Sequence, residues 1–133
     1  MDDLTLAAQA LCDETRIRIL HVIMVRECCV CEVMHALDIS QTKASRHIRI
    51  LKSAGFLRVR TDGLYSLYSM RDLSPDSFQA DLLMAVRRWF KSSPLAQEDV
   101  VRLNHYARLL PGRLTQEQES CECLACRRCV KAK

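Results

Sequence analysis

The sequence contains no apolar run long enough for a helix to cross a bilayer. Its first residues, Met1-Asp2-Asp3-Leu4, are acidic and lack the basic and apolar regions of a signal peptide. We therefore expect a cytoplasmic protein with no membrane partner. Internal repeats are absent too. Aromatic residues make up only 5% of the 133 residues, so aliphatic side chains must build most of the core.

A catalytic constellation is also missing. The four histidines are scattered among predicted helices, and no cysteine has an evident histidine partner for nucleophilic catalysis. We therefore expect that the protein is not an enzyme. The composition, 49% hydrophobic and 27% charged, is ordinary for one soluble globular domain. The net charge of +4 permits nucleic-acid binding but does not establish it.

Cysteine, by contrast, is abundant, with eight residues in the chain. In a reducing cytosol these thiols are better explained as metal ligands or redox groups than as a disulfide framework. Seven of them form two clusters: Cys28, Cys29 and Cys31, and then Cys121, Cys123, Cys126 and Cys129. The eighth, Cys12, follows the apolar periodicity around it, which predicts a small buried side chain.

Apolar periodicity predicts six helices and one β-hairpin. It places Ala44, Ile48 and Leu51 on one side of the fourth helix and turns Phe78, Leu82, Ala85 and Phe90 of the fifth mostly inward. Asp13 and Ser40 are the predicted N-caps of the second and fourth helices, and Gly55 is expected to end the fourth. The pair Asp62-Gly63 suits a tight hairpin turn, which needs positive φ angles. The expected helices cover residues 4–11, 14–24, 30–37, 41–54, 77–91 and 95–110, and the hairpin strands cover 57–60 and 64–68.

Two short helices, a tight turn at residues 38–40 and a following hairpin form a winged helix-turn-helix pattern, in a fold that is mainly α with a β-hairpin wing. In this geometry the second helix lies in the major groove of DNA. The alternative to DNA binding is that these polar residues only form the solvated face of a surface helix. The candidate DNA contacts are Gln41, Thr42, Lys43, Ser45, Arg46, Arg49 and Lys52 on the helix, Arg58 and Arg60 on the wing, and His47, which either faces DNA or supports packing.

Modules of this kind usually bind double-stranded operator DNA as symmetric dimers. We therefore expect a homodimer, with the first helix and the helices after the wing as its dimer surface. Residues 1–92 are assigned to a DNA-binding and dimerisation domain, and residues 93–112 to a C-terminal helix. Residues 113–133 form a cysteine-rich tail without apolar periodicity, which should be flexible unless a metal or partner orders it.

Three stretches of the chain resemble the ArsR/SmtB family of metal-responsive winged-helix repressors. They are residues 10–20 (ALCDETRIRIL), 27–32 (ECCVCE) and 39–48 (ISQTKASRHI). The second stretch is similar to the family's E-L-C-V-C-D box, and the third to its L-S-Q-S-x-x-S-R-H-L recognition segment. The resemblance covers roughly residues 7–90. It implies a dimeric repressor that a thiophilic ion releases from its operator.

Within the resemblance, Cys29 and Cys31 match the two cysteines of the family's box. Arsenic-sensing members have a third cysteine three residues further on, where this chain has Met34. Another branch of the family binds zinc through Asp, His and Glu side chains on the fifth helix. Residues 77–91 contain Asp81 but no histidine, so that zinc site is not expected here.

A site of three thiolates suits As(III) or Sb(III) as inducer, and Cd(II) or Pb(II) also match soft ligands. Cys29 and Cys31 would point to roughly opposite sides of an α-helix. Binding of one ion by both should therefore unwind or prevent the first turn of the third helix and displace the recognition helix. Cys28 is the nearest substitute for the missing third thiol. The alternatives are a repressor that senses oxidation through a disulfide and, in a different class, a metal-handling thiol protein.

The tail carries four thiols within nine residues, at Cys121, Cys123, Cys126 and Cys129, and basic neighbours favour their thiolate forms. Their spacing differs from paired Cys-x-x-Cys zinc sites and from iron–sulfur motifs. Three uses stay open. The tail can give a ligand to the Cys29/Cys31 site, hold a separate soft-metal ion, or act as a redox or metal-scavenging appendage.

Overall fold

The computed structural model describes residues 3–63 and 65–107, which fold into six helices and a two-stranded antiparallel hairpin. The winged helix-turn-helix fold predicted from the sequence is therefore confirmed. The tail cysteines lie outside the described residues. The elements are α1 (Asp3–Ala10), α2 (Glu14–Val25), α3 (Val30–Leu37), α4 (Gln41–Ser53), β1 (Leu57–Asp62), β2 (Tyr65–Met70), α5 (Phe78–Phe90) and α6 (Pro94–Ala107).

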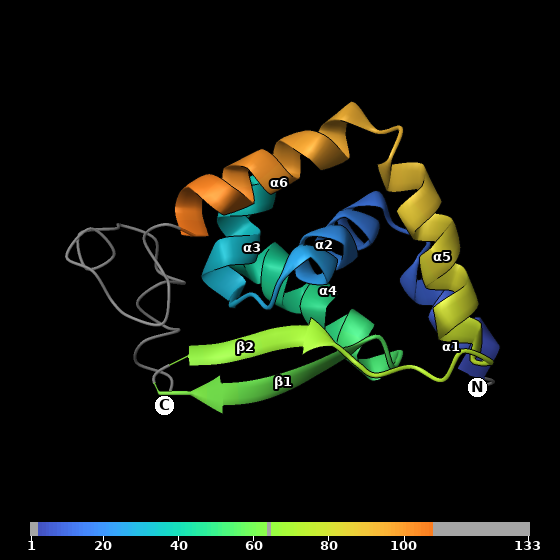
Figure 1. Ribbon diagram of the computed structural model, residues 1–133. Coiled ribbons are helices and arrows are strands. Elements are labelled where there is room, and N and C mark those ends of the chain that lie inside the picture. The colour runs from blue at the N-terminus through green and yellow to red at the C-terminus, as the bar shows by residue number, and fades with distance from the viewer. Residues whose placement is uncertain (1–2, 64, 108–133) are drawn as a thin grey trace.

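Figure 1 shows how these elements are arranged. The helices α2, α3 and α4 form the centre, the hairpin lies along one side of them, and α6 crosses the opposite side over α3. The helix α5 packs against α1 at the end of the molecule where the chain begins. The recognition helix α4 and the wing therefore both pack against α2 and α3.

Side-chain N-caps fix the first residues of α2 and α4. The carboxylate of Asp13 accepts hydrogen bonds from the amides of Thr15 and Arg16 at 2.8 and 3.3 Å. The hydroxyl of Ser40 accepts from the amide of Lys43 at 3.2 Å. Both N-cap predictions are therefore confirmed, and each cap satisfies amides that lack a partner in the first helical turn.

Left-handed residues end both helices of the helix-turn-helix. After α4, Gly55 has a φ of +89°, and the amides of Gly55 and Phe56 donate to the carbonyls of Lys52 and Leu51, each at 3.1 Å. This paired arrangement is the Schellman motif expected of a glycine at this position. After α3, Asp38 adopts the same region with a φ of 56°, which makes the tight turn before Ser40.

The hairpin turn lies one residue later than predicted. The strands pair from Leu57 with Met70 as far as Asp62 with Tyr65, so Asp62 belongs to β1. Gly63 has a φ of +60°, whereas Asp62 has no positive φ. The prediction of an Asp62-Gly63 turn is therefore wrong. The pair of Asp62 with Tyr65 extends the ladder beyond the predicted end of the first strand.

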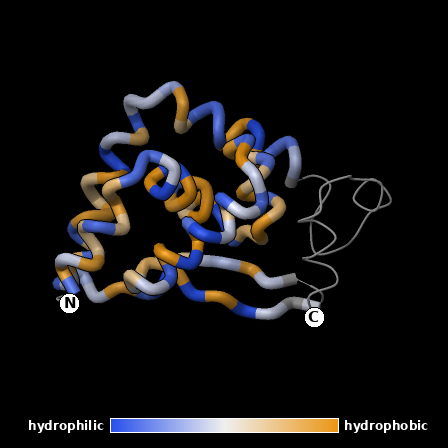
Figure 2. The backbone as a smooth tube through the Cα atoms, turned by 180° about the vertical axis from the view of Figure 1, so that it is seen from behind, coloured by the Kyte–Doolittle hydropathy of each residue, from blue (hydrophilic) through white to orange (hydrophobic). Residues whose placement is uncertain are grey.

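The core is aliphatic, as the scarcity of aromatics predicts. Figure 2 shows hydrophobic residues recurring along the central helices and alternating with hydrophilic ones around them. Phe56 is the one aromatic ring among the largest fully buried side chains of the described residues. The central cluster includes Ile19, Leu20, Val22, Val33, Ile48, Leu51, Phe56 and Leu103, so α6 contributes to the same core as the DNA-reading helices.

Two burial predictions are wrong. Cys12 is exposed, because it lies in the turn after α1, and its thiol donates to the carbonyl of Ala8 at 3.3 Å. On α5, Ala85 and Phe78 were expected to face inward, but Ala85 is exposed and Phe78 is 46% exposed. The buried residues are Leu83, Val86 and the correctly predicted Phe90. The helix has apolar residues on two sides, and periodicity alone does not say which side meets the core.

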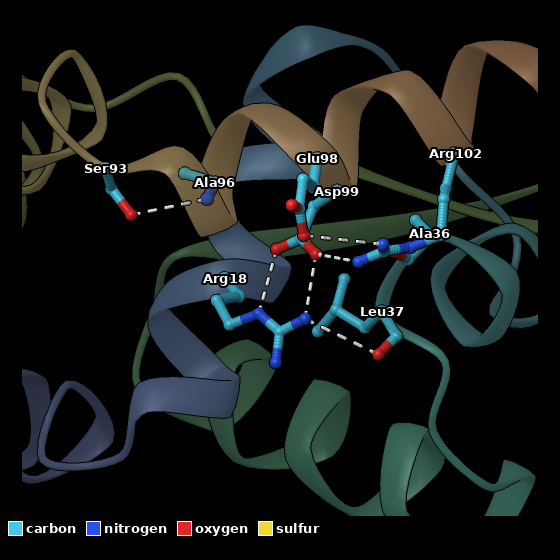
Figure 3. Close-up of polar contacts among 8 residues, drawn as sticks. All are labelled: Arg18, Ala36, Leu37, Ser93, Ala96, Glu98, Asp99 and Arg102. Carbon is cyan, nitrogen blue, oxygen red and sulfur yellow. Dashed lines mark hydrogen bonds and ion pairs between the residues drawn. The ribbon is translucent and has the colours of Figure 1, made fainter.

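An ion cluster fastens α6 to the end of α3. Asp99 is fully buried and accepts two hydrogen bonds from Arg18, both 2.8 Å long, and one of 2.6 Å from Arg102 (Figure 3). The same arginines donate to the last carbonyls of α3: Arg102 to Ala36 at 2.7 Å and Arg18 to Leu37 at 3.5 Å. The hydrogen bond with Asp99 is the main reason that the pKa of Arg18 is raised. The cluster thus fixes α3 just before the turn into α4.

Candidate functional site

The recognition helix α4 presents a polar face to solvent. Its inward side is formed by Ala44, Ile48 and Leu51, as predicted. The exposed residues on the other side are Thr42, Lys43, Arg46, Arg49 and Lys52, while Gln41 and Ser45 are half-buried. The side-chain amide of Gln41 donates through Nε2 to the hydroxyl of Ser45 at 3.1 Å, so these two side chains form one polar unit near the start of the helix. A face with cations along its length and polar groups at its N-terminal end suits phosphates and base edges.

His47 differs from the other candidates for DNA contact. It is only 4% exposed, and its Nδ1 lies 3.3 Å from Nη1 of Arg16 on α2. Burial lowers the pKa of His47, which keeps the ring neutral at physiological pH. Of the two alternatives that the sequence left open for His47, the structure favours packing between α2 and α4.

The two wing arginines already have protein partners. Arg58 donates to Ser69 at 3.2 Å and to Asp72 at 3.5 Å, within the wing and its connection to α5. Arg60 makes a two-pronged ion pair with Glu27, with hydrogen bonds of 2.7 and 2.6 Å. Nothing in the sequence pattern singled out Glu27 as a partner of the wing, because the pair joins residues 33 positions apart.

All three thiols of the first cluster are buried: Cys28, Cys29 and Cys31 are 0%, 1% and 2% exposed. Cys28 pairs with Tyr68 of β2 through two backbone hydrogen bonds of 3.0 and 2.7 Å. Cys29 is the N-cap of α3 with an extended backbone, and Cys31 lies in the first helical turn. The cluster therefore spans the boundary between the wing and α3.

The side chain of Glu32 holds this boundary in place. One carboxylate oxygen accepts a hydrogen bond of 3.0 Å from the amide of Cys29, and the other pairs with the guanidinium of Arg26. A carboxylate at this position of a helix satisfies an amide without a helical partner and interacts favourably with the helix dipole. Glu32 is itself buried. The sequence offered a signal for this role, because the pattern resembles a capping box in which a cysteine replaces the usual serine or threonine.

The thiols do not converge in this state of the protein. Within residues 3–63 and 65–107 no group of three His, Cys, Asp or Glu side chains is placed to hold a metal ion. Cys28 and Cys29 follow each other in extended backbone, so their side chains point to opposite sides. The Cys28 thiol donates to the carbonyl of Arg26 at 3.2 Å. Burial, with a smaller contribution from Glu32, raises the pKa of Cys28 to about 12, so this thiol stays protonated.

The structure changes the expectation that Cys29 and Cys31 both lie on a helix and point to opposite sides of it. Cys29 and Cys31 are not both helical, because Cys29 lies before the first helical residue, Val30. Cys29 is therefore outside the helical backbone and Cys31 is inside it. The Glu32 cap, which accepts a hydrogen bond from the amide of Cys29, holds this arrangement in place.

Across the described part of the chain, no helix combines the length and the apolar character that a membrane span requires.

Residues 13–59 match the sequence profile of the family described as bacterial regulatory protein, arsR family. That stretch contains α2, the thiol cluster, α3, α4 and the start of the wing. The match therefore covers the parts of the molecule from which the site has been built.

Individual relatives and one solved structure extend this similarity. The chain is 35% identical over 91 residues to the arsenic resistance transcriptional regulator ArsR1 of Pseudomonas putida, covering 65% of this chain and 71% of that protein. It is 37% identical over 71 residues to the cadmium resistance transcriptional regulatory protein CadC homolog of Staphylococcus aureus, covering 53% of this chain but only 59% of that protein. Reduced HlyU from Vibrio cholerae has a similar fold, with a TM-score of 0.56 at 22% identity over 65% of this chain and 88% of that one.

Proposed function

This chain belongs to the arsR family of bacterial regulatory proteins, and we propose that it is a homodimeric repressor that As(III) releases from operator DNA through the thiols of Cys29 and Cys31. The observation that carries the proposal is the placement of these buried thiols at the start of α3, directly before the recognition helix. The named relatives include regulators of both arsenic and cadmium resistance, so the choice of ion rests on the chemistry of the site.

The proposed DNA-binding surface is the outward face of α4 together with the wing. Lys43, Arg46, Arg49 and Lys52 supply exposed cations for phosphates, and the Gln41–Ser45 unit lies where base edges would be read. Arg58 belongs to the wing and keeps a partly exposed guanidinium. His47 takes part through packing against Arg16 rather than through a DNA contact.

The proposed dimer surface lies on α1 and α5, which pack against each other at one end of the molecule. Both helices expose large apolar side chains: Leu4, Leu6, Phe78, Met84 and Trp89. Large apolar side chains exposed on two helices that pack together favour association with another protein surface. A second copy of this chain satisfies the two-fold symmetry that winged-helix repressors use on palindromic sites.

As(III) fits the buried thiol cluster because the replacement of its hydroxides by cysteine thiols produces no net charge. Arsenite at neutral pH is an uncharged trihydroxide, and each thiol that binds arsenic gives its proton to a departing hydroxide, which leaves as water. The product carries no new charge. A divalent ion bound by three thiolates would leave a negative charge in a buried site beside the carboxylate of Glu32, which is unfavourable in a low dielectric. Sb(III) shares the neutral chemistry of As(III).

Two sources are open for the third ligand. Cys28 can serve if its backbone bridge to Tyr68 opens, because its thiol otherwise points toward α2. A tail cysteine can serve instead, since Tyr106 of α6 stacks at 4.0 Å on His35, one helical turn beyond Cys31. From Ala107 to Cys121 is 14 residues, which span up to about 46 Å when extended, so reach is no obstacle.

DNA binding by the reduced protein tests the proposal. The DNA is the fragment that the full chain binds most tightly in a selection from random sequences, and binding is followed by fluorescence anisotropy with As(III), Sb(III), Cd(II), Pb(II), Zn(II) or an oxidant. We expect As(III) and Sb(III) to release the DNA. The substitutions Cys29→Ser and Cys31→Ser should each abolish release, whereas Cys12→Ser is the matched control because that thiol is exposed and remote from α3.

The remaining outcomes each favour another reading. Release by As(III) that persists in both Cys29→Ser and Cys31→Ser contradicts the assignment of the site. Release only by Cd(II) or Pb(II) makes the protein a sensor of divalent soft ions, and release only by oxidant makes it a redox sensor. A comparison of Cys28→Ser with a chain truncated after Arg113 identifies the third ligand.

A further inference from the structure

The segment that carries the sensor thiols pairs with the wing at one residue. The amide of Cys28 donates to the carbonyl of Tyr68 at 3.0 Å, and the amide of Tyr68 donates back to Cys28 at 2.7 Å. On its other edge Tyr68 pairs with Val59 of β1. Cys28 therefore forms an isolated antiparallel bridge on the edge of β2 that does not pair with β1.

A second tie joins the neighbouring residue to the other strand of the wing. Both carboxylate oxygens of Glu27 accept hydrogen bonds from Arg60 of β1, at 2.6 and 2.7 Å. The side chains are half-exposed, so the pair contributes modestly to stability. Its two-pronged geometry nevertheless fixes an orientation that a single contact would not. Residues 27–31, here called the sensor segment, are thus tied to both strands of the hairpin.

Ligand binding requires the sensor segment to move. The thiols of Cys29 and Cys31 are almost wholly buried and are not accompanied by a third ligand among the described residues. An arsenic atom can therefore reach them only when the segment opens. Toward α3 the segment is continuous with a helix whose far end is anchored by Asp99. The Glu32 cap holds the amide of Cys29, and the Cys28 thiol donates to the carbonyl of Arg26. The two contacts with the wing are the remaining ties of the segment.

We propose that arsenite binding to the sensor segment releases the wing from the body of the protein. Movement of the segment breaks the bridge between Cys28 and Tyr68 and the ion pair between Glu27 and Arg60. The strands of the hairpin stay joined at their base, where the amide of Arg71 donates to Phe56 at 3.0 Å, and the wing keeps the apolar packing of Leu57 and Met70 on the core. A wing held by packing at its base alone must be ordered at each DNA encounter, which lowers affinity. This inference rests on the proposed function, in which Cys29 and Cys31 bind arsenite.

Amide hydrogen exchange measured by NMR on the reduced full chain tests the proposal. With one equivalent of arsenite, the amides of Cys28 and Tyr68 should exchange about tenfold faster or more, because each loses its acceptor. The amide of Arg71 is the internal control, since it donates to Phe56 across the base of the hairpin and has no hydrogen bond to the sensor segment. Retention of arsenite after gel filtration shows independently whether the ion is bound.

The outcomes separate the two proposals. If arsenite is retained and the Cys28 and Tyr68 amides stay as slow as before, wing release is wrong and the proposed function stands. If no arsenite is retained, the proposed function fails and wing release fails with it. If Arg71 accelerates as much as Tyr68, the whole hairpin unfolds and selective release of the wing is refuted.

A pair of matched variants examines the second tie without any ligand. Arg60→Gln removes the ion pair with Glu27, whereas Arg58→Gln removes an arginine on the same strand whose partners are Ser69 and Asp72. We expect the Tyr68 amide to exchange about threefold faster in Arg60→Gln than in Arg58→Gln. Equal exchange rates in the two variants would remove the Glu27–Arg60 pair from the mechanism.

Discussion

The substitution Asp99→Asn should destabilise this protein strongly. Asp99 has no solvent exposure, and its carboxylate receives three hydrogen bonds, two from Arg18 and one from Arg102. Asparagine keeps the shape but removes the negative charge, which leaves the largely buried Arg18 without a counter-ion. Removing one partner of a buried ion pair costs about 3–5 kcal/mol. Because Arg102 is partly exposed and can turn to water, we expect a loss near the lower end, about 3 kcal/mol.

Urea unfolding followed by circular dichroism measures this loss, and Glu98→Gln provides the matched control. Glu98 precedes Asp99 on α6 and lies 3.9 Å from Arg102, but it is mostly exposed. Its substitution should change the free energy of unfolding by less than about 0.5 kcal/mol. A loss in Asp99→Asn no larger than that in Glu98→Gln would show that the buried cluster contributes nothing beyond a surface pair, and the reasoning from burial would be wrong.

Three further predictions concern separate parts of the molecule. Burial raises the pKa of Cys28 to about 12 in the folded state, above the ordinary pKa of a thiol, which is about 9. The unfolded state therefore ionises first, and stability falls as pH rises above about 9. Between pH 8 and 10 the wild type should lose about 1 kcal/mol more in urea unfolding than Cys28→Ala, and parallel curves would contradict this. Gly55→Ala should cost about 1 kcal/mol or more in thermal unfolding, because φ is +89° and a Cβ would lie 3.2 Å from Gln79; an unchanged midpoint would refute it. Lys52→Gln should reduce the slope of log affinity for DNA against log salt by about 1, and an unchanged slope would exclude a phosphate contact.

The order and limits of the elements followed closely from local signals. Asp13 and Ser40 mark helix starts because their side chains accept hydrogen bonds from amides of the first helical turn. Gly55 marks a helix end because glycine readily adopts the positive φ that the end of α4 requires. The outward face of α4 was also predictable, since Ala44, Ile48 and Leu51 alone set which side meets the core. These features depend on residues close together in the sequence.

The features that escaped prediction depend on residues far apart in the sequence. The ties of Cys28 to Tyr68 and of Glu27 to Arg60 join a helix start to a hairpin, and no spacing rule connects those positions. The sequence left open whether His47 faces DNA or packs, because its contact with Arg16 joins two helices 31 residues apart. The prediction that Phe78 faces inward on α5 was wrong. An apolar residue on the exposed side of a helix has the same local sequence pattern as an apolar residue that faces the core.

The helix α3 is anchored at both ends by different partners, and this asymmetry decides where a disturbance at the thiols would be felt. Its C-terminal carbonyls are held by Arg18 and Arg102, which Asp99 neutralises inside the protein. Its N-terminal boundary is held by the Glu32 cap and by half-exposed or single-residue ties to the wing. The weaker anchor should yield first, so an ion that pulls on Cys29 would disturb the wing before the turn into α4. Weakening the strong anchor with Asp99→Asn should spread the effect of arsenite into α4, which hydrogen exchange at the Ala44 amide, bonded to Ser40 at 2.9 Å, would reveal.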